Sequence, residues 1–311
     1  MRSTGFGLAL ALLSALTFSS SGPLAHSLID AGWSPEAAVA TRVGIASLVL
    51  AVPAAVALRG RWGVLRRNLA SMGLFGLLGV GAAQVGFFNA IRYLPVGVSL
   101  LLEYLGVILV VFWMWAVHGQ RPRALTAAGT VAAVFGLVLV LDLAGGGAGL
   151  DPVGVLWGLL AAVGLATYFV LGARVDPELP AITLASGGMA AGSAVLWLLG
   201  FTGLVPLHAT FGDVTLSGHH VGWWVPMAGL SLVAAVVAYV AGIGAARILG
   251  ARLASFVGLT EVCFAVLISW LVLHELPTAV QLVGGALILA GVALVRLDEG
   301  RPAPEPALAT T

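Results

Sequence analysis

The stretch Ala90-Ile-Arg-Tyr-Leu94 returns 155 residues later as Ala245-Ala-Arg-Ile-Leu249. At this constant offset the match extends without gaps over residues 88–140 and 243–295. Apolar composition alone can inflate such an alignment, so the polar, aromatic and helix-breaking identities matter most. They are Arg92/Arg247, Trp115/Trp270, Pro122/Pro277, Gly129/Gly284 and Gly136/Gly291. The sequence therefore contains a duplicated unit.

The composition is that of a membrane protein. Of the 311 residues, 60% are hydrophobic and only 9% are charged, with a mean hydropathy of +1.08. So few charges could not cover a water-soluble surface of this size. The net charge of +1 predicts no nucleic-acid partner, and the single cysteine, Cys263, allows no internal disulfide and predicts no metal site.

The apolar runs predict an all-α polytopic protein with ten transmembrane helices, because a span needs about 20 mostly apolar residues. Arg2 and the apolar run 6–18 also imitate a secretory signal peptide, but cleavage there would leave the first copy of the repeat incomplete. The predicted spans are 5–25, 36–58, 69–91, 96–118, 124–143, 153–174, 181–203, 222–246, 252–273 and 279–297.

The arginines predict the orientation. With both termini in the cytoplasm, 12 of the 14 arginines fall in cytoplasmic segments, as the positive-inside rule requires. Five spans per unit force the second copy into the inverted orientation, so Arg92 lies outside and its counterpart Arg247 inside. We expect a first repeat at 1–143, a second at 150–297 and a disordered cytoplasmic tail at 298–311.

Two carboxylates, Glu103 and Glu261, lie well within predicted spans. A charge there costs roughly 2.5–3.5 kcal/mol on insertion scales, so each must face protein or a water-filled cavity. In the repeat alignment each acid lies three residues, about one helical turn, from the counterpart of the other. The two acids are candidates for binding a substrate amine or a coupling proton, and a structural role in assembly stays open.

Other polar residues in the spans are weaker candidates. Arg42 could reach outward to the interface, pair with Glu36, or bind a substrate carboxylate. Gln84 and Asn89 form a polar strip that suits either helix–helix hydrogen bonds or substrate contact. The aromatic candidates for a cavity wall are Tyr104, Tyr168 and Tyr239.

Glycines predict one close helix contact. Gly129 and Gly136 in span five match Gly284 and Gly291 in span ten, and the spacing of seven places each pair on one face. We expect these two helices to pack together across the pseudo-twofold axis.

Several segments resemble the drug/metabolite transporter superfamily and its EamA domains. The carriers of the resemblance are Gly258-Leu-Thr-Glu-Val-Cys-Phe-Ala-Val-Leu-Ile-Ser-Trp-Leu-Val-Leu-His-Glu275, Gln281-Leu-Val-Gly-Gly-Ala-Leu-Ile-Leu-Ala-Gly291 and Leu94-Pro-Val-Gly-Val-Ser-Leu-Leu-Leu-Glu-Tyr-Leu-Gly106. The last of these is similar to the threonine/homoserine exporter branch. The resemblance implies two inverted five-helix repeats and transport. Val107 and Val262 replace a proline common in the family, which removes the expected cause of a kink there.

These observations favour a secondary transporter, by resemblance an exporter, that moves amino acids or related amphipathic metabolites by alternating access in a bacterial inner membrane. A lipid-group flippase of the same fold is the alternative, and an integral-membrane lipid enzyme is a weaker one. No nucleotide-binding or nucleophile motif appears, so we expect no enzymatic activity and no cofactor, with proton coupling left open. The expected partners are a small-molecule substrate and the lipid bilayer, with homodimerisation undecided.

Overall fold

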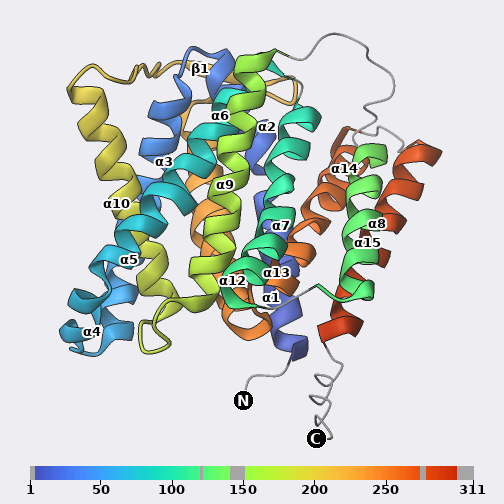
Figure 1. The fold of residues 1–311 in the computed structure, drawn as a ribbon. Helices are drawn as coiled ribbons and strands as arrows, with labels where there is room; N and C mark the ends of the chain where they lie inside the picture. Colours follow the sequence, from blue (N-terminus) through green and yellow to red (C-terminus); the bar gives the residue numbers. More distant parts are fainter. Residues whose placement is uncertain (1–3, 95, 120–121, 141–150, 274–277, 300–311) are drawn as a thin grey trace, which may run out of the picture.

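A computed structural model describes residues 4–94, 96–119, 122–140, 151–273 and 278–299. The chain is mostly helical, with one short hairpin at one end of the molecule (Figure 1). The end that carries this hairpin is called the hairpin end below, and the opposite end, where α4 lies, is called the α4 end. Residues 141–143 of the predicted span 124–143 and most of the predicted tail at 298–311 lie outside the described residues.

The described residues of the first repeat form nine helical elements. They are α1 (Thr4–Phe18), α2 (Ser21–Asp30), α3 (Pro35–Leu58), α4 (Trp62–Arg67), α5 (Leu69–Leu74), the π-helix η1 (Phe75–Ala82), α6 (Ala83–Tyr93), α7 (Val96–His118) and α8 (Ala124–Val140).

The second repeat contains the hairpin as well as helices. Its elements are α9 (Pro152–Arg174), α10 (Ala181–Phe201), β1 (Asp213–Leu216), β2 (His219–Gly222), α11 (Trp224–Ala228), the π-helix η3 (Gly229–Val237), α12 (Ala238–Leu249), α13 (Ala251–Gly258), α14 (Thr260–Leu273) and α15 (Ala279–Glu299). Helix α15 thus runs two residues beyond the predicted span, and the Asp298 carboxylate accepts a hydrogen bond from Thr126 at 2.5 Å.

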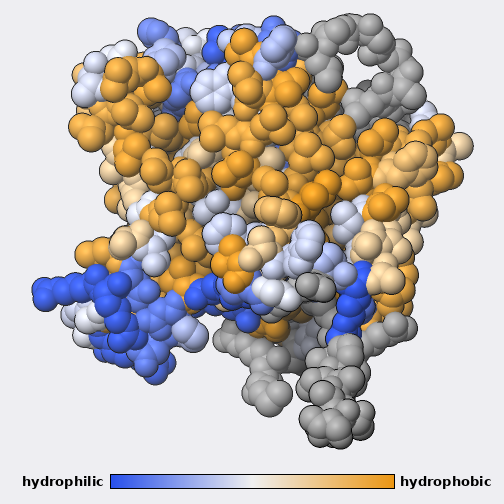
Figure 2. Space-filling model, in the orientation of Figure 1, coloured by the Kyte–Doolittle hydropathy of each residue, from blue (hydrophilic) through white to orange (hydrophobic). Residues whose placement is uncertain are grey.

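The protein is a multi-pass membrane protein. Within the described residues, seven helices are long and apolar enough to cross a membrane: Thr4–Asp30, Pro35–Leu58, Leu69–Tyr93, Val98–His118, Pro152–Arg174, Ala181–Phe201 and Trp224–Leu249. A shorter apolar helix covers Ala124–Leu139. The predicted spans 252–273 and 279–297 are also helical, as α13–α14 and α15. Hydrophobic side chains cover the middle of the molecule between more polar ends (Figure 2).

The first predicted span is not one continuous helix. It breaks at Ser19 and Ser20, and α2 continues to Asp30, five residues past the predicted end. The two serine hydroxyls donate to the carbonyls of Leu16 and Thr17, and such bonds compete with the helix backbone. Pro23 has no N–H to donate to the carbonyl of Ser19, which lies four residues before it.

Span nine also breaks, at Leu259, although the proline common in the family is absent. The Thr260 hydroxyl donates to the carbonyl of Val257 at 2.7 Å, beside Gly258. The break lies before Glu261 rather than after it. Helix α7, which carries Glu103, continues unbroken through Val107.

The two π-helical segments lie at equivalent places in the two repeats. Shifting η1 (75–82) by the repeat offset of 155 places it on residues 230–237, within η3. A π-helix is rare and widens the backbone locally, often at a functional site. Its presence in both copies shows that the duplication preserves backbone geometry as well as sequence.

Helices α8 and α15 pack through the glycines of the repeat. A Cβ atom built on Gly136 would lie 2.6 Å from the carbonyl oxygen of Gly284, and one on Gly129 would lie 2.8 Å from that of Gly291. Gly129 corresponds to Gly284, and Gly136 to Gly291, so each glycine meets the counterpart of the other. This crossed pairing is what a twofold-related contact requires.

Loops of both repeats meet at each end of the molecule. At the hairpin end, the Trp33 indole donates to the carbonyl of Thr210 at 2.7 Å, and the Ser34 hydroxyl donates to that of Pro206 at 2.7 Å. At the α4 end, Arg67 pairs with Asp176 and Glu178. The repeat relates these two sites: the connection between spans one and two corresponds to that between spans six and seven.

Asp176 is the centre of the contact at the α4 end. Its carboxylate accepts hydrogen bonds from the Asn68 amide at 2.9 Å, the Glu178 backbone N–H at 2.9 Å and the Arg67 guanidinium at 2.8 Å. These donors, of which Asn68 has the largest effect, lower the pKa of Asp176 from 3.8 to about 2. Because the pKa of Asp176 is lower in the folded protein than in the unfolded chain, the ionised carboxylate stabilises the fold at pH values above about 4. This contribution is lost as the pH falls from about 4 towards 2.

We expect Gly136→Ala to lower the thermal unfolding midpoint in detergent, because overpacking a close contact costs about 1–3 kcal/mol. Gly73→Ala is the control, since a Cβ on Gly73 meets no atom within 4 Å. Equal midpoints for the two variants would contradict close packing between α8 and α15.

We expect Asp176→Asn to lower the unfolding midpoint equally at pH 5 and pH 8, because Asp176 is ionised across that whole range. The measurement is a thermal unfolding series over pH. A variant whose deficit grew or shrank within this window would show that Asp176 titrates there.

Candidate functional site

A cavity of about 290 Å³ lies between the two repeats. Its lining comes from both copies: the break between α1 and α2, together with η1, α6 and α7, meets α9, α12, α13 and α14. Ser217 adds a contact from the turn of the β1–β2 hairpin, where it and Gly218 both have positive φ, at 50° and 79°. The cavity therefore extends from the middle of the bundle to the hairpin end.

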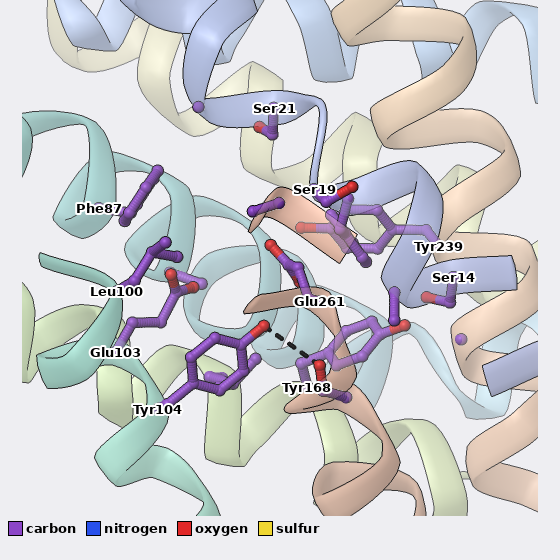
Figure 3. Close-up of a pocket in the computed structure, with 18 of the residues that line it drawn as sticks. Ser14, Ser19, Ser21, Phe87, Leu100, Glu103, Tyr104, Tyr168, Tyr239 and Glu261 are labelled. Atoms are coloured by element: carbon purple, nitrogen blue, oxygen red, sulfur yellow. Dashed lines mark hydrogen bonds between the residues drawn. The ribbon is translucent and has the colours of Figure 1, made fainter. Parts of the chain in front are cut away.

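Glu103 and Glu261 both line this cavity (Figure 3). Glu103 comes from α7 and Glu261 from the first turn of α14, directly after the break at Leu259. Beside Glu103, the Tyr104 hydroxyl donates to the carbonyl of Gly258 at 3.3 Å and connects α7 to the end of α13, just before the break that precedes Glu261. The structure thus brings the two sequence candidates into one site.

Aromatic rings form one wall of the cavity. Tyr168 of α9 and Tyr239 of α12 meet edge to face, with centroids 5.3 Å apart, and Phe18 at the end of α1 lies 5.2 Å from Tyr239. All three residues line the cavity, as do Tyr104 and Phe87. The Tyr168 oxygen is buried and has no hydrogen-bond partner in the described residues. This wall suits an apolar or aromatic ligand body.

Arg42 lies behind the cavity and does not line it. Its side chain is 0% exposed, so it does not reach outward, and it does not pair with Glu36. Its guanidinium donates to Ser21 Oγ at 3.0 Å, Gln84 Oε1 at 2.7 Å and the carbonyl of Ala234, in η3, at 2.7 Å. Arg42 therefore connects α3 to three other spans.

Gln84 and Asn89 have different positions although they share a helix. Gln84 lines the cavity and accepts from Arg42. Asn89 lies outside the lining and donates to Glu36 Oε1 at 2.8 Å and to the carbonyl of Val85. Within the described residues, Asn89 has a helix–helix contact rather than a contact with the cavity.

Matching against family models covers residues 5–142 and 152–297 with the EamA-like transporter family, once for each repeat. The chain belongs to the EamA-like transporter family. It is therefore a membrane transporter of the drug/metabolite type, and members of this family are transporters rather than enzymes.

The fold matches that of solved structures as well. One, entitled "Crystal structure of protein", superposes with a TM-score of 0.70 at 21% identity and covers 94% of this chain and 95% of its own. At that identity the likeness concerns the fold alone. A search of curated proteins gives no match.

Sequence reasoning did not identify Ser21, Gly258 or Ser217 as cavity residues. The run Thr17-Phe-Ser-Ser-Ser-Gly-Pro23 signals a helix break, because three serines precede a glycine and a proline. No local signal places the tip of a hairpin at the cavity mouth, because that contact joins residues some 200 positions apart along the chain.

We expect Arg42→Met to lower the unfolding midpoint strongly, because it leaves buried acceptors unpaired at roughly 1–3 kcal/mol each. Arg92→Met is the control, since the Arg92 side chain is exposed. The measurement is thermal unfolding of both purified proteins in the same detergent. A similar small change in both would show that the Arg42 hydrogen bonds contribute little to stability.

Proposed function

We propose that the protein is a secondary transporter of small metabolites that carry an amino group, such as amino acids or related amphipathic compounds. The observation that carries the proposal is the cavity between the repeats, with the carboxylates of Glu103 and Glu261 on its wall. Ionisable groups inside a membrane bundle usually mark a substrate or proton pathway. In inverted-repeat transporters the site lies at the repeat interface.

The size and lining of the cavity favour a small solute. Its volume of about 290 Å³ is near the lower limit of the range of about 300–1,000 Å³ typical of ligand pockets. Tyrosine, serine and glutamate side chains contribute to its wall, which suits a polar solute with an apolar body better than a lipid chain.

The repeat supports a mechanism of alternating access. We propose ten spans in a bacterial inner membrane, with the α4 end and both termini in the cytoplasm and the hairpin end outside. The loop contacts at the two ends then form and break alternately as the repeats rock about the cavity. The resemblance to exporters favours outward transport. Proton coupling through either acid and facilitated diffusion predict different responses of the transport rate to an imposed pH gradient.

We expect Glu103→Gln and Glu261→Gln each to reduce uptake of labelled amino acids into proteoliposomes by at least about tenfold, the effect of losing about 1.4 kcal/mol of binding. Asp30→Asn is the control, because this exposed carboxylate pairs with His26 within α2 and lies outside the cavity lining. Under proton coupling, wild-type flux also rises with an imposed pH gradient and the coupling variant loses that response. Flux unchanged in both cavity variants would exclude a transport role for the acids.

A further inference from the structure

Acidic side chains line the cavity, whereas the buried arginine lies behind its wall. Its described lining includes two carboxylates, Glu103 and Glu261, and no arginine, lysine or histidine. The nearest buried cation, Arg42, is separated from the cavity by Ser21 and Gln84, to which it donates hydrogen bonds. The cavity thus offers two carboxyl groups directly and a positive charge only through Ser21 and Gln84.

Arg42 determines what Ser21 and Gln84 can offer a ligand. Ser21 Oγ and Gln84 Oε1 both accept from the guanidinium, so Ser21 still has its O–H and Gln84 its two N–H donors, beside the Tyr239 hydroxyl. Both side chains line the cavity and are more than nine-tenths buried, at 7% and 8% exposure. These two residues, called the donor pair below, therefore face the cavity as donors polarised by a buried cation.

Helix α2 reinforces the donor pair. Ser21 is its first residue, and Ser21, Gly22 and Pro23 line the cavity, so the ten-residue helix begins at the cavity wall. The N-terminus of a helix carries a partial positive charge and free N–H groups. The donor pair and the helix terminus favour an anionic group at the same point.

We propose that the cavity binds the α-amino acid zwitterion, with the carboxylate at the donor pair and the ammonium group at Glu261 and Glu103. In Figure 3 the Glu261 side chain extends towards the region of Ser19 and Ser21. A ligand bound there between the two poles would face Phe18, Tyr168 and Tyr239 with its side chain. Arg42 is then a positioning residue that acts through Ser21 and Gln84 without touching the substrate. This inference rests on the proposed function and specifies which end groups the substrate must carry.

The test compares three ligands with the same isobutyl group: L-leucine, isoamylamine, which lacks the carboxylate, and 4-methylpentanoate, which lacks the amine. Binding to the purified protein is measured by ligand-induced thermal stabilisation, and transport by counterflow in proteoliposomes. We expect L-leucine to bind at least about tenfold more tightly than either analogue. Isoamylamine leaves the donor pair without a partner, and 4-methylpentanoate leaves the two glutamates without one.

Gln84→Glu tests the donor pair directly. This change keeps an oxygen for Arg42 and replaces the N–H₂ donor by an acceptor. We expect it to weaken L-leucine binding at least about tenfold while isoamylamine binding is unchanged or tighter. Ser21→Ala removes the other donor and should likewise weaken L-leucine binding relative to isoamylamine binding. It replaces Gln84→Glu as the test if that variant does not fold.

The outcomes separate the two proposals. Isoamylamine binding as tightly as L-leucine, equal losses of both ligands in Gln84→Glu, or binding of none of the three would overturn the zwitterion site. Binding of L-leucine with the expected ratios but without counterflow would support the site and count against the transport function.

Discussion

The guanidinium of Arg42 is fully buried in an apolar bundle, where its N–H groups need protein acceptors, although Nε has none in the described residues. It finds them on three other spans: a serine at the break in span one, a glutamine on span three and a carbonyl in the π-helix of span eight. Each of these partners is located at an irregular backbone segment or at the cavity wall. The arrangement of the site therefore depends on how this one charge is accommodated.

The repeat explains much of the remaining architecture. The crossed glycine contacts of α8 and α15, the matching π-helices and the corresponding loop contacts at the two ends all follow from one unit used twice. The chemistry at the ends differs, however. The α4 end uses carboxylates and an arginine, whereas the hairpin end uses an indole, hydroxyls and backbone carbonyls. The two ends are therefore held together by different chemistry at equivalent places in the repeat.

The cavity departs from the symmetry of the repeats. Span one is broken and its counterpart α9 is continuous, whereas span nine is broken and its counterpart α7 is continuous. Glu103 and Glu261 come from equivalent helices but lie one turn out of register, so the two acids do not have equivalent surroundings. A symmetric framework with an asymmetric site suits a small ligand whose two ends differ.

The sequence by itself determined the membrane class and the duplicated unit, because hydropathy and a constant offset are one-dimensional signals. It also identified Glu103 and Glu261, since an acid in an apolar span stands out without any knowledge of its neighbours. Only the tertiary structure decided that Arg42 bonds to Ser21 and Gln84 instead of Glu36, and that Asn89 faces away from the cavity. Those outcomes depend on helix rotation and on contacts between distant spans, and apolar helices of nearly uniform hydrophobicity carry little periodic signal from which rotation could be predicted.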